Sequence, residues 1–149
     1  MKKILTLILI TLIFSCQTDK SKQMNEERKL IIENYIKAYN GFDIDGMVKD
    51  LDKAVVFENV TNGEVDLTTN GVEEFRKQAE SATAYFRERE QSVQSWDFKE
   101  NEIIVDIAYK AILAIELPNG MKPGDTLELK GQSVFTFKDG KVVKIQDRS

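Results

Sequence analysis

Residues 126–147 read TLELKGQSVFTFKDGKVVKIQD, two stretches rich in β-branched and aromatic residues on either side of Asp139-Gly140. An Asp-Gly pair between alternating apolar residues favours a tight β-hairpin. We therefore predict adjacent antiparallel strands over residues 126–138 and 141–147. Alternate residues of a strand point to the same side. One face of this hairpin is predicted to carry Leu127, Leu129, Ser133, Phe135, Phe137, Val143, Ile145 and Asp147.

Four more strands are predicted upstream of this hairpin. Residues 54–60 and 64–68 flank Asn62-Gly63, another hairpin turn. Residues 91–99 and 102–116 precede a loop at 119–125 that is rich in Gly and Pro. In the longer of these two strands the inward positions are expected to be Val105, Ile107, Tyr109, Ala111, Leu113 and Ile115.

Three helices are predicted before and between these strands. Apolar residues recur at helical spacing from Glu26 to Asn40, and Gly41 follows. Asp43 is the predicted N-cap of a shorter helix that ends near Leu51. A third helix is predicted after Asn70, capped by that residue with Glu73 reaching back. Its apolar stripe is Val72, Phe75, Ala79, Ala82 and Phe86. The fold class is therefore α+β, with three N-terminal helices on one face of a strongly bent antiparallel sheet.

The chain begins MKKILTLILITLIFSC, in which two lysines precede an apolar run and a small residue, Ser15. This layout is typical of a secretory signal peptide, here residues 1–15. Ile13-Phe14-Ser15-Cys16 also resembles the lipobox of bacterial lipoproteins, which implies a lipid on Cys16. The alternative is an ordinary signal peptide that ends in a cysteine. Residues 16–25 are predicted to be a polar tether, and residues 26–149 the domain.

Composition excludes several kinds of site. The chain has no His and one Cys, so the usual zinc and copper sites, catalytic triads based on His, and a disulfide within one chain are excluded. A net charge of −4 without a basic cluster argues against a nucleic-acid partner. We expect no cofactor, and we expect contact with a bacterial membrane only through the lipid.

The strings YIKAYNGFDIDGMVKDL, VVFEN, NGVEEFR and LKGQSVFTFKDGKVVKI, in this order, resemble the SnoaL-like branch of the nuclear transport factor 2-like superfamily. The resemblance covers Glu26 to Asp147. It implies a cone, in which a bent sheet wraps around the helices and encloses a pocket. Members include polyketide cyclases, ketosteroid isomerases, dehydratases and proteins that only bind or assemble, so the fold leaves the function open.

Alignment with the ketosteroid isomerases of this superfamily implies roles for three positions. Tyr35 falls on the tyrosine that donates a hydrogen bond to the substrate oxygen. Asn59 falls on the general base, and Ser133 on the acidic hydrogen-bond donor. An amide oxygen is too weakly basic to deprotonate carbon, so isomerase chemistry of that kind is not expected.

Asp147 is the candidate acid or base, since related cyclases and dehydratases often carry an acidic residue near the end of this strand. A solvated terminal carboxylate is the alternative. Tyr35 and Tyr39 share a helix face, and Trp96 is predicted to stack on a flat ligand. Each of these aromatic residues is alternatively a core side chain. The candidate ligand-binding residues are Tyr35, Tyr39, Phe57, Asn59, Trp96, Tyr109 and Ser133.

Three functional hypotheses follow. In the first, a lipid-anchored protein of the cell envelope binds a small hydrophobic molecule in an apolar cone. In the second, the protein is a cyclase, isomerase or dehydratase with Asp147 as general base. In the third, it is an assembly module that forms a homodimer through the outer face of the sheet. Burial of Asp147 beside Tyr35 and Asn59 would favour catalysis.

Overall fold

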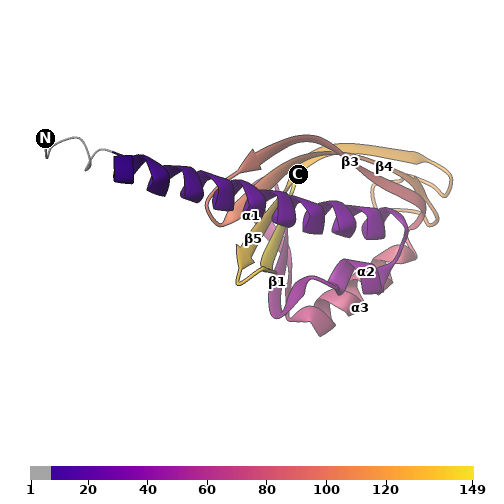
Figure 1. Cartoon of the computed structure of the whole chain (residues 1–149). Coiled ribbons are helices and arrows are strands. Elements are labelled where there is room, and N and C mark those ends of the chain that lie inside the picture. Colours follow the sequence, from indigo (N-terminus) through magenta and orange to yellow (C-terminus); the bar gives the residue numbers. More distant parts are fainter. Residues whose placement is uncertain (1–7) are drawn as a thin grey trace, which may run out of the picture.

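The computed structural model describes residues 8–149, and their side chains from Lys20 onward. Its elements are α1 (Ile8–Asn40), α2 (Ile44–Val48), β1 (Leu51–Thr61), β2 (Glu64–Asn70), α3 (Val72–Thr83), β3 (Phe86–Phe98), β4 (Glu102–Leu113), β5 (Thr126–Lys138) and β6 (Lys141–Arg148). The helices lie on one side of a sheet that curls around them (Figure 1). The predicted α+β cone is confirmed.

The sheet has six strands in the order β2-β1-β6-β5-β4-β3. Its pairs are antiparallel except one, because β1 runs parallel to β6. The predicted antiparallel sheet is therefore wrong at this one pair. Parallel strands need a long connection, and the segment from β2 to β5 supplies it. This pairing places Asn59 beside Asp147.

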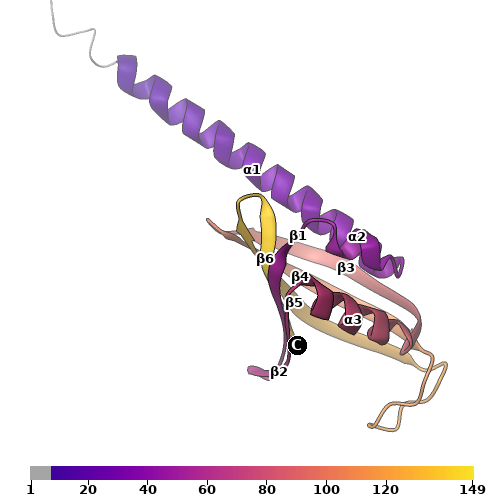
Figure 2. The ribbon, with the colours of Figure 1, turned by 90° about the horizontal axis from the view of Figure 1, so that it is seen from below.

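The core fills the space between the helices and the concave face of the sheet. Ile32 of α1 and Phe135 of β5 are almost fully buried there, together with Ile103 and Ile145. α3 packs against β1 and β2, and α1 packs against β3. Figure 2, seen from below, shows α1 and α3 along the same side of the strands. The remaining space between these layers becomes the pocket described below.

α1 begins at Ile8, earlier than the predicted start at Glu26. Residues 16–25, predicted to be a tether, thus have a helical backbone, and this part of α1 projects beyond the sheet (Figure 1). The physical reason is local: residues 17–28 contain neither Gly nor Pro and include several strong helix formers. Residues 1–7 of the leader and the side chain of Cys16 lie outside the described residues. No helix in the described part of the chain is long and apolar enough to cross a membrane.

The predicted boundaries of α3 are corrected at both ends. Gly71, with a φ of 87°, occupies the N-cap position instead of Asn70. The residue that reaches back is Glu74, whose carboxylate accepts a 2.8 Å hydrogen bond from the backbone N–H of Asn70. The helix ends at Thr83, so Phe86 belongs to β3 instead of the helical stripe. Gly71 takes the cap because its backbone adopts a positive φ without a Cβ clash.

Several strand predictions need correction. β3 starts at Phe86 instead of Gln91, and its charged first residues pair with the end of β4. The register of β6 shifts at a bulge opposite Thr136 and Phe137, which buries Val142 in place of Val143. Beyond the bulge, Ile145 and Asp147 keep the predicted inward side. Ile115 lies past the end of β4, and Leu129 is also exposed, so neither belongs to the core.

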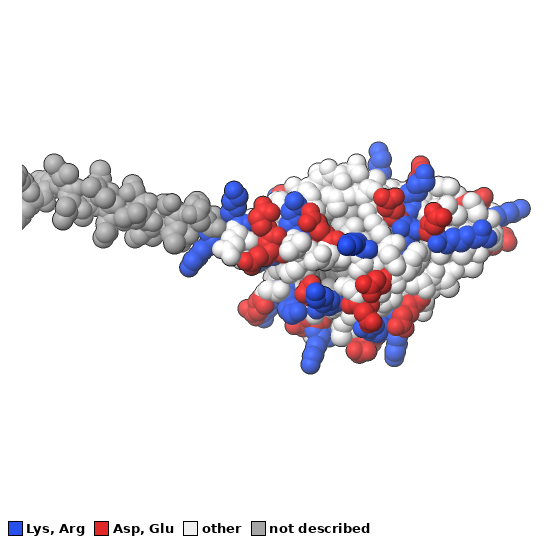
Figure 3. Space-filling view, turned by 45° about the vertical axis from the view of Figure 1, so that its right-hand side comes forward, with Lys and Arg blue, Asp and Glu red and all other residues white. Residues whose placement is uncertain are grey.

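Charged side chains of both signs are interspersed on the face shown in Figure 3. Lys110 on β4 contacts Glu128 on β5 at 3.3 Å, and both side chains are exposed on the outer face of the sheet. Arg76 of α3 contacts Asp45 of α2 at 2.7 Å. Such exposed pairs add little to stability.

Candidate functional site

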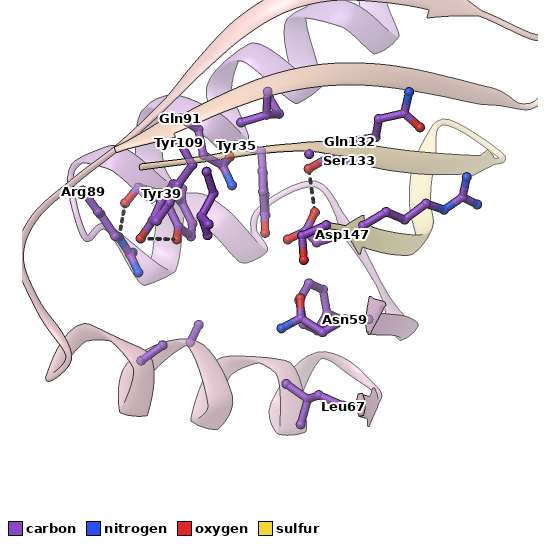
Figure 4. Close-up of a pocket in the computed structure, with 18 of the residues that line it drawn as sticks. Tyr35, Tyr39, Asn59, Leu67, Arg89, Gln91, Tyr109, Gln132, Ser133 and Asp147 are labelled. Atoms are coloured by element: carbon purple, nitrogen blue, oxygen red, sulfur yellow. Dashed lines mark hydrogen bonds between the residues drawn. The ribbon is translucent and has the colours of Figure 1, made fainter. Parts of the chain in front are cut away.

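A cavity of about 340 Å³ opens between the helices and the concave face of the sheet. Its apolar walls include Met47, Phe57, Leu67, Phe75 and Ile107. A volume of this size suits a small organic molecule. The polar side chains that line it gather in two groups on opposite sides of the cavity, one around Asp147 and one around Arg89 (Figure 4).

Asp147, near the end of β6, forms the centre of the first group. It lies opposite Ser133 of β5, whose hydroxyl donates a 2.6 Å hydrogen bond to the carboxylate. Burial raises the pKa of Asp147 to about 6, and the hydrogen bond from Ser133 opposes part of this rise. The carboxyl group can therefore change its protonation state near neutral pH, as an acid or base in catalysis must.

Asn59 lies next to Asp147 because their strands pair in parallel at these residues. Figure 4 shows both side chains at the same side of the pocket, with Ser133 above them. The two positions that carry carboxyl groups in the isomerases thus hold an amide and a hydroxyl here. The carboxylate of this group comes from Asp147 alone, since Asn59 and Ser133 are neutral.

Tyr35 lies between the two polar groups. Its ring is buried and packs edge-on against Phe135 at a centroid distance of 5.5 Å. Burial, with a further contribution from the negative charge of Asp147, raises the pKa of the Tyr35 hydroxyl. The phenol therefore stays protonated and can donate a hydrogen bond into the cavity that it lines.

The second group consists of Tyr39, Tyr109 and Arg89. The hydroxyl of Tyr39 donates to that of Tyr109 at 3.4 Å. Arg89, on β3, is only 5% exposed, and its guanidinium lies 3.8 Å from the centroid of the Tyr39 ring. Burial raises the pKa of both tyrosines, so both remain neutral hydrogen-bonding groups.

The structure brings together all but one of the residues predicted to bind a ligand. The cavity is lined by Tyr35, Tyr39, Phe57, Asn59, Tyr109, Ser133 and Asp147. Asp147 is partly buried in its wall, and the side chain of Cys16 is not described. Whether these side chains bind a ligand stays a prediction.

Trp96 is the exception, because it does not line this cavity. Its ring stacks on Phe98 at 6.2 Å, and the ammonium group of Lys29 lies 5.5 Å from its centroid. A bulge in β3 between Val93 and Ser95 sets the register of this stretch, and Trp96 pairs with Val105 at the far end of the strand from Arg89. The indole therefore covers the core beneath α1.

Sequence reasoning missed Arg89, Gln91 and Phe75 as lining residues. Phe75 was recognisable as a core residue of α3, but its contact with the cavity depends on where the helix docks. Arg89 lies in the segment FRERE, in which the other charged residues point to solvent. Alternation places Arg89 on the same side of the strand as Gln91, and both residues line the cavity. The predicted strand began at Gln91, five residues after the true start at Phe86, so Arg89 fell outside it.

Several solved structures are similar in fold. A proposed polyketide cyclase from Xanthomonas campestris pv. campestris has a TM-score of 0.71 at 15% identity, over 85% of this chain and 92% of the other. AclR, a proposed hydroxylase from Streptomyces galilaeus, has a TM-score of 0.66 at 21% identity, with 82% and 87% covered. IdmH, a proposed polyketide cyclase from Streptomyces antibioticus, has a TM-score of 0.67 at 14% identity, with 80% and 88% covered.

Such identities establish the fold and leave the activity of this chain open. A comparison with curated proteins found no match. The profile of one domain family matches residues 32–145. This range includes all the polar residues of the two groups described above except Asp147. The cone, its cavity and this match over most of the sequence lead to one conclusion: the chain belongs to the SnoaL-like domain family.

Proposed function

We propose that the cavity binds a small, mostly apolar molecule that carries a carbonyl group, and that Asp147 exchanges a proton with it. The observation that carries the proposal is the carboxyl group of Asp147 in the cavity wall, with a pKa raised to about 6 by burial. A solvated surface carboxylate has a pKa near 4 and is a weaker base. Burial of Asp147 beside Asn59 and in the same cavity as Tyr35 favours catalysis over binding alone.

In the proposed reaction, the ionised carboxylate of Asp147 removes a proton from the carbon next to the ligand carbonyl. The C–H bond breaks, an O–H bond forms on Asp147, and negative charge moves to the carbonyl oxygen. The hydroxyl of Tyr35 donates a hydrogen bond to that oxygen. Asp147 then returns its proton to the ligand. This general step is shared by cyclases, isomerases and dehydratases, so it fits the enzyme hypothesis.

The step can be tested before the natural ligand is identified. The probe is 2-tetralone, a ketone of naphthalene size with exchangeable protons next to its carbonyl. In D₂O, we expect the purified domain to speed exchange of these protons above the rate in buffer, as followed by ¹H NMR. The rate should rise with pH through about 6, because only the ionised form of Asp147 accepts a proton.

Asp147→Asn should abolish the added exchange, because the amide has no basic oxygen. Asp106→Asn is the matched control: Asp106 points away from the cavity, where it accepts hydrogen bonds from Ser95 and Gln132. Equal exchange by the wild type and Asp147→Asn would contradict the catalytic proposal. If 2-tetralone bound without faster exchange, the hypothesis of a binding protein would be favoured instead.

We also propose that a lipid on Cys16 anchors the domain to a bacterial membrane. The support is the lipobox-like sequence Ile13-Phe14-Ser15-Cys16 after an apolar run. Cys16→Ser should move the full-length protein from the membrane fraction to the soluble fraction of the producing bacterium. Ser15→Ala keeps a small residue at the cleavage site and should leave the protein in the membrane fraction. Retention of Cys16→Ser in membranes would contradict the proposal.

A further inference from the structure

Arg89 is a buried cation in the cavity wall. Its Nε donates a 2.8 Å hydrogen bond to the carbonyl oxygen of Tyr39, and the guanidinium lies over the rings of Tyr39 and Phe42 at 3.8 and 4.3 Å. One terminal nitrogen contacts the sulfur of Met47 at 4.0 Å. In the described residues 20–149, it forms no ion pair with an Asp or Glu.

These contacts leave part of the cost of burying the charge uncompensated. The carbonyl of Tyr39 belongs to the last turn of α1, where the helix carries a partial negative charge. The aromatic faces add a further attraction for a cation. A full counter-charge is nevertheless what a buried guanidinium normally requires. Asp147 does not supply it, because it forms no ion pair with Arg89 and lies on the other side of the pocket (Figure 4).

Further hydrogen-bonding groups lie at the same end of the cavity. The Tyr39 hydroxyl uses its proton in the hydrogen bond to Tyr109. The proton of the Tyr109 hydroxyl can therefore be donated to a ligand. The backbone N–H of Gln91 donates to the side-chain oxygen of Asn40 at 2.7 Å, and the side-chain nitrogen of Asn40 donates to the Gln91 carbonyl at 3.1 Å. Gln91 also lines the cavity. Figure 4 shows Arg89, Tyr39, Tyr109 and Gln91 together, on the side of the pocket away from Asp147.

We infer that the ligand of this cavity carries a carboxylate, which the guanidinium of Arg89 and the hydroxyls of Tyr39 and Tyr109 bind. The apolar body of the ligand then lies against Phe57, Phe75 and Ile107, with its reactive end towards Asp147. Arg89 is a binding residue in this arrangement, and the carboxylate completes its charge compensation. The inference rests on the ligand-binding part of the proposed function and adds the charge and the orientation of the ligand.

Two probes of nearly equal shape test the inference on the unaltered domain. 2-Naphthoate carries a carboxylate where 2-acetonaphthone carries a neutral methyl ketone. At pH 8, we expect 2-naphthoate to bind at least about tenfold more tightly than 2-acetonaphthone. Charge-assisted hydrogen bonds in a desolvated site typically give a ratio of this size. Isothermal titration calorimetry measures both dissociation constants. Equal or tighter binding of 2-acetonaphthone would overturn the inference and leave the proposed function standing.

Variants then assign the preference to Arg89. Arg89→Met should weaken binding of 2-naphthoate about tenfold or more and change binding of 2-acetonaphthone little, whereas Arg89→Lys should retain part of the preference. Arg87→Met is the matched control, because it removes the same charge from an exposed position on the same strand. A preference for 2-naphthoate that survives in Arg89→Met would overturn the inference.

The remaining outcomes are also decisive. If Arg89→Met does not fold, Arg89→Lys and the comparison of the two probes on the wild type decide the question. Binding of neither probe by the folded wild type would overturn both the inference and the ligand-binding function. Proton exchange on 2-tetralone without any preference for 2-naphthoate would uphold the proposed function alone.

Discussion

Ser133 and Asp147 face each other across the β5–β6 pair and are joined by a hydrogen bond of 2.6 Å. Two opposing effects meet at this contact. Burial favours the neutral carboxylic acid, while the serine hydroxyl donates to the charged form and stabilises it. Burial is the larger effect, so the pKa of Asp147 rises to about 6.

The raised pKa predicts how stability depends on pH. Between pH 4 and 6, the folded protein retains a proton on Asp147 that the unfolded chain has lost. The free energy of unfolding should therefore fall as pH rises through this window, by up to about 3 kcal/mol. Asp147→Asn does not titrate, so it should be more stable than the wild type at pH 8 and similar to it near pH 4.

Urea unfolding at pH 4.5 and pH 8 measures this difference. Asp106→Asn serves as the control of opposite sign, because hydrogen bonds from Ser95 and Gln132 lower the pKa of Asp106. That variant should gain no stability at pH 8. Wild-type and Asp147→Asn proteins with parallel pH profiles would contradict a raised pKa at Asp147.

Removal of the serine hydroxyl should raise the pKa of Asp147 above 6. Ser133→Ala leaves the burial of the carboxyl group in place and deletes the hydrogen bond that opposes it. The carboxyl ¹³C chemical shift of Asp147, followed by NMR as a function of pH, reports this pKa directly. Ser95→Ala, which removes a bond to Asp106 instead, should leave the titration of Asp147 unchanged.

Tyr35 should contribute one neutral hydrogen bond to a carbonyl ligand. Tyr35→Phe is expected to weaken binding of 2-acetonaphthone by about 0.5–1.5 kcal/mol, which calorimetry resolves. The exposed Tyr85 offers a matched Tyr→Phe control outside the cavity. Equal affinities of Tyr35→Phe and the wild type would show that the Tyr35 hydroxyl does not reach the ligand.

The inward face of β5 should dominate its contribution to stability. Phe135 is 1% exposed, and Phe135→Ala should cost about 3–5 kcal/mol of unfolding free energy. Lys110→Ala should cost less than about 0.5 kcal/mol, because the pair with Glu128 lies in solvent. Denaturant unfolding of both variants checks the register, and similar losses at the two sites would be inconsistent with it.

Alternation and turn residues were enough to predict much of the site. Asp139-Gly140 fixes the hairpin that places Ser133 opposite Asp147, and both residues keep the side that alternation assigns them. Helical spacing likewise places Tyr35 and Tyr39 on one face of α1. These features depend on neighbours in the sequence, so local patterns predict them.

The features that were not predicted depend on contacts between distant segments. The parallel pairing that brings Asn59 to Asp147 follows from the topology of the whole sheet. The bulge that buries Val142 instead of Val143 adds one residue to a strand, and nothing in its composition marks it. Arg89 becomes a cavity residue only because the end of α1 packs over β3. Charged side chains are ordinarily exposed, so the residue type gave no sign of this position.

The position of β6 in the sheet has a consequence for the order of synthesis. β6 follows the other five strands in the sequence, but it lies between β1 and β5 and joins the β1–β2 hairpin to the β3–β5 meander. Until the ribosome has added β6, one edge of β1 is unpaired, and β5 at the edge of the meander also lacks its partner strand. The two halves of the sheet therefore dock only after translation has passed Asp147, and the cavity of the nascent chain is incomplete until this wall residue has been made.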